Sequence, residues 1–153
     1  MKVIFLDFDG VLNSYPYDCQ RTSEQGNIDE TRLPLLKSIV DAIQAKIVLS
    51  SSWRKHWNKD KNLCDTIGRE IESLFSKYNL TIFDKTPELS NNDREKEIKL
   101  WLNENKAVSR FVILDDMLLG FGNLQEYLVN TNYRIGRGLE KIHVEKAIKL
   151  LNE

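Results

Sequence analysis

Short apolar runs recur along the chain and alternate with stretches whose apolar residues return every three or four positions. An uninterrupted run of four to eight apolar residues is typical of a parallel strand that is covered on both faces. Four runs fit this pattern clearly, and a fifth, at 127–131, fits it less well. These runs predict strands at 3–6, 47–50, 80–83, 111–114 and 127–131.

The periodic stretches between the runs predict four amphipathic helices, because their apolar residues fall on one face of a helix. The repeating positions are Leu36, Ile39, Val40 and Ile43; Leu63, Ile67, Ile71, Leu74 and Phe75; Ile98, Trp101 and Leu102; and Val144, Ala147, Ile148 and Leu151. Alternating strands and helices indicate an α/β, three-layer, Rossmann-like fold with a mainly parallel five-stranded sheet. Ligands of such sheets bind beyond the carboxyl ends of the strands.

Composition and charge narrow the class of protein. The chain has 153 residues, of which 41% are hydrophobic and 29% charged, and its formal net charge is −1. The length and composition predict one globular domain over residues 1–153. The chain does not have the excess of basic residues that many nucleic-acid-binding proteins carry. No apolar run is long enough for a membrane span, and the first run ends at Asp7, too soon for a signal peptide. Cys19 and Cys64 match no metal or redox spacing, so we expect reduced thiols in a cytoplasmic protein.

Carboxylates follow the first and the fourth predicted strands. Asp7 and Asp9 flank one aromatic residue and are followed by Gly10, and Asp115 and Asp116 are adjacent. Strand ends of a parallel sheet share one edge, so the four carboxylates would lie near one another, which is unfavourable without a cation. Oxygen ligands of this kind suit Mg²⁺. The simpler interpretations are an Asx turn at Asp9 and solvated loop acids at 115–116.

Two further segments offer groups that could hold an anion. Ser50 and Ser51 end the second strand, where hydroxyls and free backbone N–H groups can bind phosphate, although a serine there can equally cap a helix. Arg94 and Lys96 lie at the start of the third helix, after Asp93 as a candidate N-cap. Cations at a helix N-terminus are unfavourable to its dipole and invite an anion, but either side chain could simply be a solvated charge.

Taken in this order along the chain, these four segments resemble the four motifs of the haloacid dehalogenase (HAD) superfamily. Asp7-Phe8-Asp9-Gly10-Val11 is similar to the first motif, Ser50-Ser51 to the second, Arg94 to the third and Asp115-Asp116 to the fourth. Ser51-Ser52-Trp53-Arg54, the stretch 94–102 and Gly138-Leu139 also resemble a compact subgroup, the HAD domain of "Swiss Army knife" RNA-repair proteins. Glu95 and Glu140 depart from that subgroup, which tends to have glycine and threonine there.

The resemblance implies a Mg²⁺-dependent phosphatase with an aspartyl-phosphate intermediate. Asp7 would be the nucleophile and Asp9 the general acid and base. Mg²⁺ would be held by Asp7, the backbone carbonyl of Asp9, and Asp116, with Asp115 binding directly or through water. The phosphoryl oxygens would be held by Ser51 in preference to Ser50, and by Arg94 in preference to Lys96.

The substrate is less closely defined than the reaction. Residues 13–27 are too few for a cap domain but could form a flap, with Tyr15, Pro16 and Tyr17 helping to close it. Capless members resemble enzymes that accept bulky phosphates, and the aromatic and basic residues of 53–59 could stack a base and contact a nucleic-acid backbone. We therefore expect phosphorylated nucleic-acid ends. The alternatives are a small-molecule or nucleotide phosphatase, a phosphoacceptor signalling domain, and a binding domain without turnover.

Overall fold

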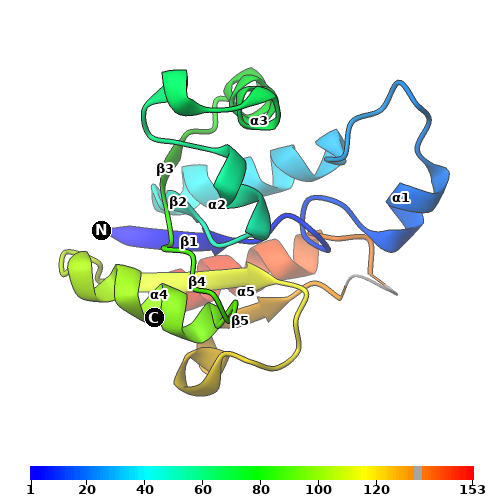
Figure 1. Cartoon of the computed structure of the whole chain (residues 1–153). Coiled ribbons are helices and arrows are strands. Elements are labelled where there is room, and N and C mark those ends of the chain that lie inside the picture. The colour runs from blue at the N-terminus through cyan, green and yellow to red at the C-terminus, as the bar shows by residue number, and fades with distance from the viewer. Residues whose placement is uncertain (133–135) are drawn as a thin grey trace.

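Five parallel strands form the centre of the computed structural model, which describes residues 1–132 and 136–153 (Figure 1). Their order across the sheet is β3-β2-β1-β4-β5, and all four neighbouring pairs are parallel. The predicted α/β fold with a parallel five-stranded sheet is therefore confirmed. The strands are β1 (Lys2–Leu6), β2 (Lys46–Leu49), β3 (Ile82–Lys85), β4 (Arg110–Asp115) and β5 (Leu128–Asn130).

The direction in which strands are added reverses on either side of β1. From β1 the chain adds β2 and then β3 on one side, and then crosses to add β4 and β5 on the other. Such a reversal leaves a crevice at the carboxyl ends of the two central strands, because the connections leave in opposite directions. The segments after β1 and β4 therefore meet at a position suited to ligand binding.

Helices cover both faces of the sheet, and the alternation of side chains along β1 explains the two layers. Ile4 and Leu6 pack in one core with α2 (Leu33–Ile43), α3 (Thr66–Lys77) and α5 (Lys141–Asn152). Val3 and Phe5 face the other core, against α4 (Arg94–Glu104). The remaining helices are α1 (Tyr15–Gln20) and the short 3₁₀ helices Glu30–Arg32, Ser52–His56, Lys61–Leu63 and Gly122–Tyr127.

The boundaries differ from the sequence prediction mainly around α3. Leu63 was expected on the buried stripe of this helix but is 68% exposed and lies in a separate 3₁₀ turn. The reason is local: the carboxylate of Asp65 accepts a hydrogen bond from the backbone of Gly68 and starts the helix at Thr66. Ile67 is also 37% exposed, so the buried stripe begins only at Ile71. Strand β3 begins two residues later than predicted, at Ile82–Lys85, and β5 is shorter than predicted, at Leu128–Asn130.

The segment 13–27, the expected flap, contains α1 and lies beside the carboxyl ends of the strands (Figure 1). Ser14 caps α1, and the hydroxyl of Tyr17 donates to the backbone carbonyls of Gly26 and Ile28, which ties the two ends of the segment together. No domain-sized insertion occurs between the strands within 1–132. Among the described helices, none has the length and apolarity that a bilayer crossing requires.

Candidate active site

Asp7 and Asp115 meet at the crevice between the two central strands. Asp7 directly follows β1, and its backbone N–H donates to the carbonyl of Leu114 in β4 over 2.9 Å. Asp115 is the last residue of β4. Both side chains are largely buried, Asp7 at 6% and Asp115 at 0% exposure, so neither carboxylate is a solvated loop acid.

A cluster of three carboxylates occupies this crevice. Oxygens of Asp7, Asp115 and Asp116 lie within 4.8 Å of one another. Burial, together with the charge of Asp7, raises the pKa of Asp115 to about 7, and burial also raises the pKa of Asp7 and of Asp116. Each carboxylate makes the negative charge of its neighbours less favourable, and a divalent cation bound among them would offset this repulsion. Carboxylate oxygens are also the ligands that a hard cation such as Mg²⁺ prefers. The residues present therefore fit the metal that the sequence predicts.

Gly10 allows Asp116 to join the cluster. Gly10 has a φ of +74°, and a Cβ atom placed on it would lie 2.4 Å from the Cβ of Asp116. Any other residue would thus displace Asp116 and strain the turn as well. The turn is also held by the residue that follows β5, since the hydroxyl of Thr131 donates to the Gly10 carbonyl over 2.5 Å.

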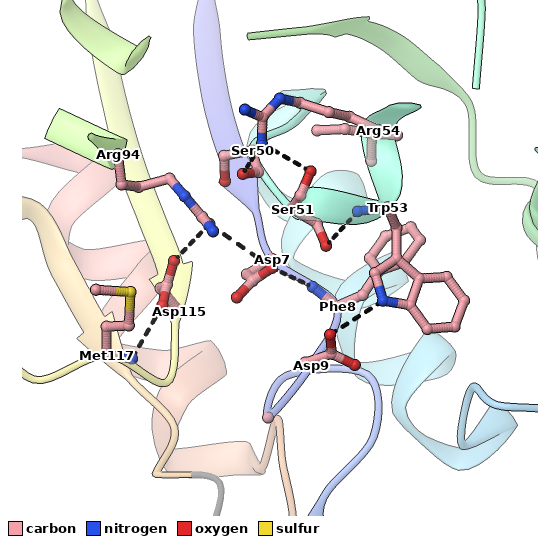
Figure 2. A network of polar contacts seen from close by, with 12 residues as sticks. Asp7, Phe8, Asp9, Ser50, Ser51, Trp53, Arg54, Arg94, Asp115 and Met117 are labelled. Atoms are coloured by element: carbon pink, nitrogen blue, oxygen red, sulfur yellow. Dashed lines mark hydrogen bonds and ion pairs between the residues drawn. The ribbon is translucent and has the colours of Figure 1, made fainter. Parts of the chain in front are cut away.

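Asp9 lies beside this cluster, with its carboxylate turned away from it (Figure 2). One carboxylate oxygen accepts from Trp53 Nε1 at 3.0 Å, and the other accepts from Asn13 Nδ2 at 2.9 Å. The sequence prediction gave Asp9 a metal contact through its backbone carbonyl only, so the side chain is free for another role. The contribution of Asp9 to metal binding stays a prediction.

Of the two candidate serines, Ser51 is the one that faces Asp7. A hydrogen bond from Ser51 lowers the pKa of Asp7, partly offsetting the effect of burial. The Ser51 Oγ also accepts from the backbone N–H of Trp53 over 3.2 Å, so the capping role occurs as well. Ser50 is fully buried, and its Oγ has no hydrogen-bond partner among the described residues.

Of the two candidate cations, Arg94 reaches the site and Lys96 does not. Arg94 Nη1 lies 2.9 Å from Asp115 Oδ2 and 3.6 Å from Asp7 Oδ1. Lys96 is exposed, and its backbone N–H donates to the capping carboxylate of Asp93 over 3.0 Å. Positions two apart on a helix point to nearly opposite sides, so only one of the two side chains can face the crevice.

A buried ion pair supports both anion-binding segments, and the sequence analysis did not find it. Arg54 Nη1 donates to the carbonyls of Ser50 and Ser51, each over 2.9 Å, and Arg54 Nη2 donates to Glu97 Oε1 over 2.7 Å (Figure 2 shows the side of Arg54 that faces the serines). Arg54 and Glu97 are 3% and 1% exposed. The expectation that Arg54 contacts a nucleic-acid backbone is therefore wrong, because its charge is used inside the protein.

Other residues of 53–59 also differ in their surroundings. Trp57 is buried, 1% exposed, and cannot stack a base, whereas Trp53 is only partly buried and lies beside Asp9. Asn13, which holds Asp9, was not among the predicted site residues. Its one signal in the sequence is proximity to Asp9, which is too common a feature to identify it.

Comparison with known proteins agrees with this geometry. A family model described as the HAD domain in Swiss Army Knife RNA repair proteins matches residues 3–144. No curated protein and no solved structure matches the chain. The matched range includes every residue of the crevice described above. The chain therefore belongs to the family of HAD domains found in Swiss Army Knife RNA repair proteins.

Proposed function

We propose that this protein is a Mg²⁺-dependent phosphomonoesterase that forms a covalent phosphoryl intermediate on Asp7. Membership of a HAD domain family supports a phosphohydrolase. The observation that carries the finer proposal is the position of Asp7. Its carboxylate lies at the switch in strand order, near the oxygens of Asp115 and Asp116, and is contacted by Ser51 and Arg94.

The proposed reaction gives one role to each carboxylate of the first motif. An Asp7 oxygen attacks the phosphorus atom, and the bond from phosphorus to the leaving oxygen breaks while Asp9 gives that oxygen a proton. Water then attacks the same phosphorus and gives a proton to Asp9. The bond between phosphorus and Asp7 breaks, which releases inorganic phosphate and restores the Asp7 carboxylate and the protonated Asp9.

The remaining residues of the crevice hold the ions in place. Asp7, Asp116, the Asp9 carbonyl and Asp115 would hold Mg²⁺, which, when bound, offsets the repulsion between the attacking carboxylate and the phosphate. The Ser51 hydroxyl and Arg94 would bind the phosphoryl oxygens. Arg94 is suited to this, since a guanidinium has five N–H donors and can contact phosphate while keeping its bond to Asp115.

For the substrate, we propose phosphorylated nucleic-acid ends. Two observations support this choice: the RNA-repair description of the family, and the absence of a domain-sized insertion over the crevice within residues 1–132. A nucleotide or another small phosphate ester is the second candidate. The expected cytoplasmic location stays a prediction.

Hydrolysis assays test this proposal. The substrates are p-nitrophenyl phosphate and oligonucleotides phosphorylated at the 3′ or the 5′ end, each with Mg²⁺ and with EDTA. We expect metal-dependent phosphate release that is lost in Asp7→Asn, greatly reduced in Arg94→Ala and retained in Lys96→Ala. Trapping of labelled phosphate on the wild-type protein, but not on Asp7→Asn, would identify the acceptor. Metal-dependent turnover that survives Asp7→Asn would exclude Asp7 as the nucleophile.

A further inference from the structure

A groove runs alongside Trp53, next to the candidate active site. Two cavities of about 240 and 270 Å³ share Asn27, Trp53 and Ile67 in their lining and are therefore adjacent. The groove is bounded by the end of the flap, by the 3₁₀ helix that follows β2, and by the first three turns of α3. All of its lining residues lie within the described part of the chain.

The groove lies on the side of the site where a leaving group would be. In Figure 2, Asp7 lies between Arg94 and Asp115 on one side and Asp9 and Trp53 on the other. Trp53 Nε1 is 3.0 Å from the Asp9 carboxylate. The inference rests on the proposed function in one respect: if Asp9 protonates the leaving oxygen, the rest of the leaving group continues past Asp9 toward Trp53.

The walls of the groove are apolar and partly open to solvent. Ile67, Ile71 and Leu74 come from one face of α3, at i, i+4 and i+7, and they line the groove together with Trp53. Ile67 is 37% exposed although it is apolar and lies at the start of a buried stripe. A flat apolar ligand would remove this surface from water, and the indole offers it a stacking partner.

Two charged side chains on the groove have no counter-charge in the described structure. Glu70 lines one cavity and Lys55 the other, and both are exposed and form no ion pair with any residue of 1–132 or 136–153. The Glu70 carboxylate can accept hydrogen bonds from the amino groups of a base, and it would repel a second phosphate. Lys55 can contact a neighbouring phosphate or a base carbonyl.

We propose that this groove binds the nucleobase of the nucleoside that carries the scissile phosphate. An aromatic wall, an apolar wall and a hydrogen-bond acceptor together match a planar heterocycle with amino groups. A free nucleotide and a nucleic-acid end both present this group beside their phosphate. The groove thus specifies a nucleoside phosphate. A free nucleotide and a nucleic-acid end differ only in whether further nucleotides are attached to it, and substrates of different length distinguish the two.

The first test compares substrates with and without a base. We expect kcat/KM for nucleoside 5′-monophosphates to exceed that for ribose 5-phosphate by about tenfold or more, since stacking of one base on an aromatic side chain has roughly this effect. Ile67→Asn should reduce this ratio severalfold. Leu100→Asn is the matched control, because Leu100 is 40% exposed on α4 at the other face of the sheet.

A second variant tests whether the groove forms hydrogen bonds with the amino group of a base. Glu70→Ala should lower the preference for cytosine over uracil, because cytosine has an amino donor where uracil has a carbonyl acceptor. A higher kcat/KM for a phosphorylated oligonucleotide than for the mononucleotide would identify a nucleic-acid end as the source. The reverse order would identify a nucleotide.

Binding of unphosphorylated nucleosides to Asp7→Asn gives a readout that does not depend on turnover. Trp57 and Trp101 are 1% and 2% exposed, so fluorescence quenching by a ligand in the groove reports mainly on Trp53. We expect saturable quenching by nucleosides but not by ribose, weakened by Ile67→Asn. Absence of quenching, or equal kcat/KM for ribose 5-phosphate and the nucleotides, would overturn the inference. Absence of hydrolysis with quenching intact would instead contradict the proposed function and leave the groove assignment standing.

Discussion

Replacing Glu97 by alanine removes one half of a buried ion pair and should destabilise the protein strongly. Glu97 Oε1 accepts from Arg54 Nη2 at 2.7 Å and from the backbone N–H of Leu89 at 2.9 Å. Both members of the pair are almost fully buried. In the variant, the guanidinium of Arg54 would keep its charge in a buried position, and the Leu89 N–H would lose its acceptor.

The expected loss follows from those two unsatisfied groups. Breaking a buried ion pair by removing one partner costs about 3–5 kcal/mol, which is a large part of the roughly 5–15 kcal/mol that stabilises a typical domain. For a protein of this size, each kcal/mol shifts the melting temperature by roughly 2–4 °C, so we expect a decrease of roughly 6–20 °C. Asp41→Ala is the control, since Asp41 pairs with Lys37 on the surface and should cost less than about 1 kcal/mol.

Denaturant titration of a double-mutant cycle measures the pairwise part of this loss. Arg54→Met should be about as destabilising as Glu97→Ala, because it leaves a buried carboxylate and frees the carbonyls of Ser50 and Ser51. The double variant removes both charges of the pair and leaves neither one unpaired, so its loss should fall short of the sum by about 1–3 kcal/mol. Additive losses, or single losses near that of Asp41→Ala, would refute the view that this pair holds the two segments together.

Three further changes have defined outcomes. Mg²⁺ at a hundred times its Kd should stabilise the wild-type protein by about 2.7 kcal/mol, and Asp116→Asn should remove most of this increase in melting temperature. Gly10→Ala should also remove it, because the new Cβ would occupy the position of Asp116. Burial lowers the pKa of His143 from 6.5, so the stability that its neutral ring contributes is present above that pH and is lost as the pH falls. In His143→Gln this loss should be weaker, while the glutamine side chain still offers an acceptor to the Glu140 N–H. Unfolding experiments at about pH 5 and about pH 7.5 measure the difference.

Each of these outcomes can fail in a distinct way. A melting-temperature response to Mg²⁺ that persists in both Asp116→Asn and Gly10→Ala would place the metal elsewhere. The melting-temperature response to Ca²⁺ can be compared with the response to Mg²⁺, since Ca²⁺ accepts the same oxygen ligands with looser geometry. An unchanged pH dependence in His143→Gln would show that other groups control acid stability.

The sequence predicts the sheet and the closeness of Asp7 and Asp115 at its edge, because both depend on short-range patterns. Apolar runs identify strands that are buried on both faces, and topology then brings their carboxyl ends together, so Asp7 and Asp115 could be placed without coordinates. The choice of Arg94 over Lys96 could not be made in this way. It depends on the rotation of α4 about its own axis, which packing against the sheet sets.

Features that depend on contacts between distant elements were missed for the same reason. Glu97 precedes the apolar residue Ile98 and looks like an ordinary surface acid in the sequence, yet it pairs with Arg54, 43 positions away. The position of Ile67 was misjudged because its spacing fits the buried stripe, while its location in the first turn of α3 leaves it beside the groove. Periodicity gives the face of a helix but not how far the neighbouring layer extends over it.

The place of β1 in the sheet also affects how the protein is made. Its register pairs Val3 with Lys46 on one side and with Phe111 on the other. A ribosome therefore completes β1, β2 and β3 long before β4 emerges, and until then one edge of β1 has no partner. Unpaired apolar edges of this kind invite aggregation, so a truncated or stalled chain should depend on chaperones more than the full-length one. The nascent chain also lacks the Asp115-Asp116 pair through this interval, so it has no complete metal site with which to stabilise itself.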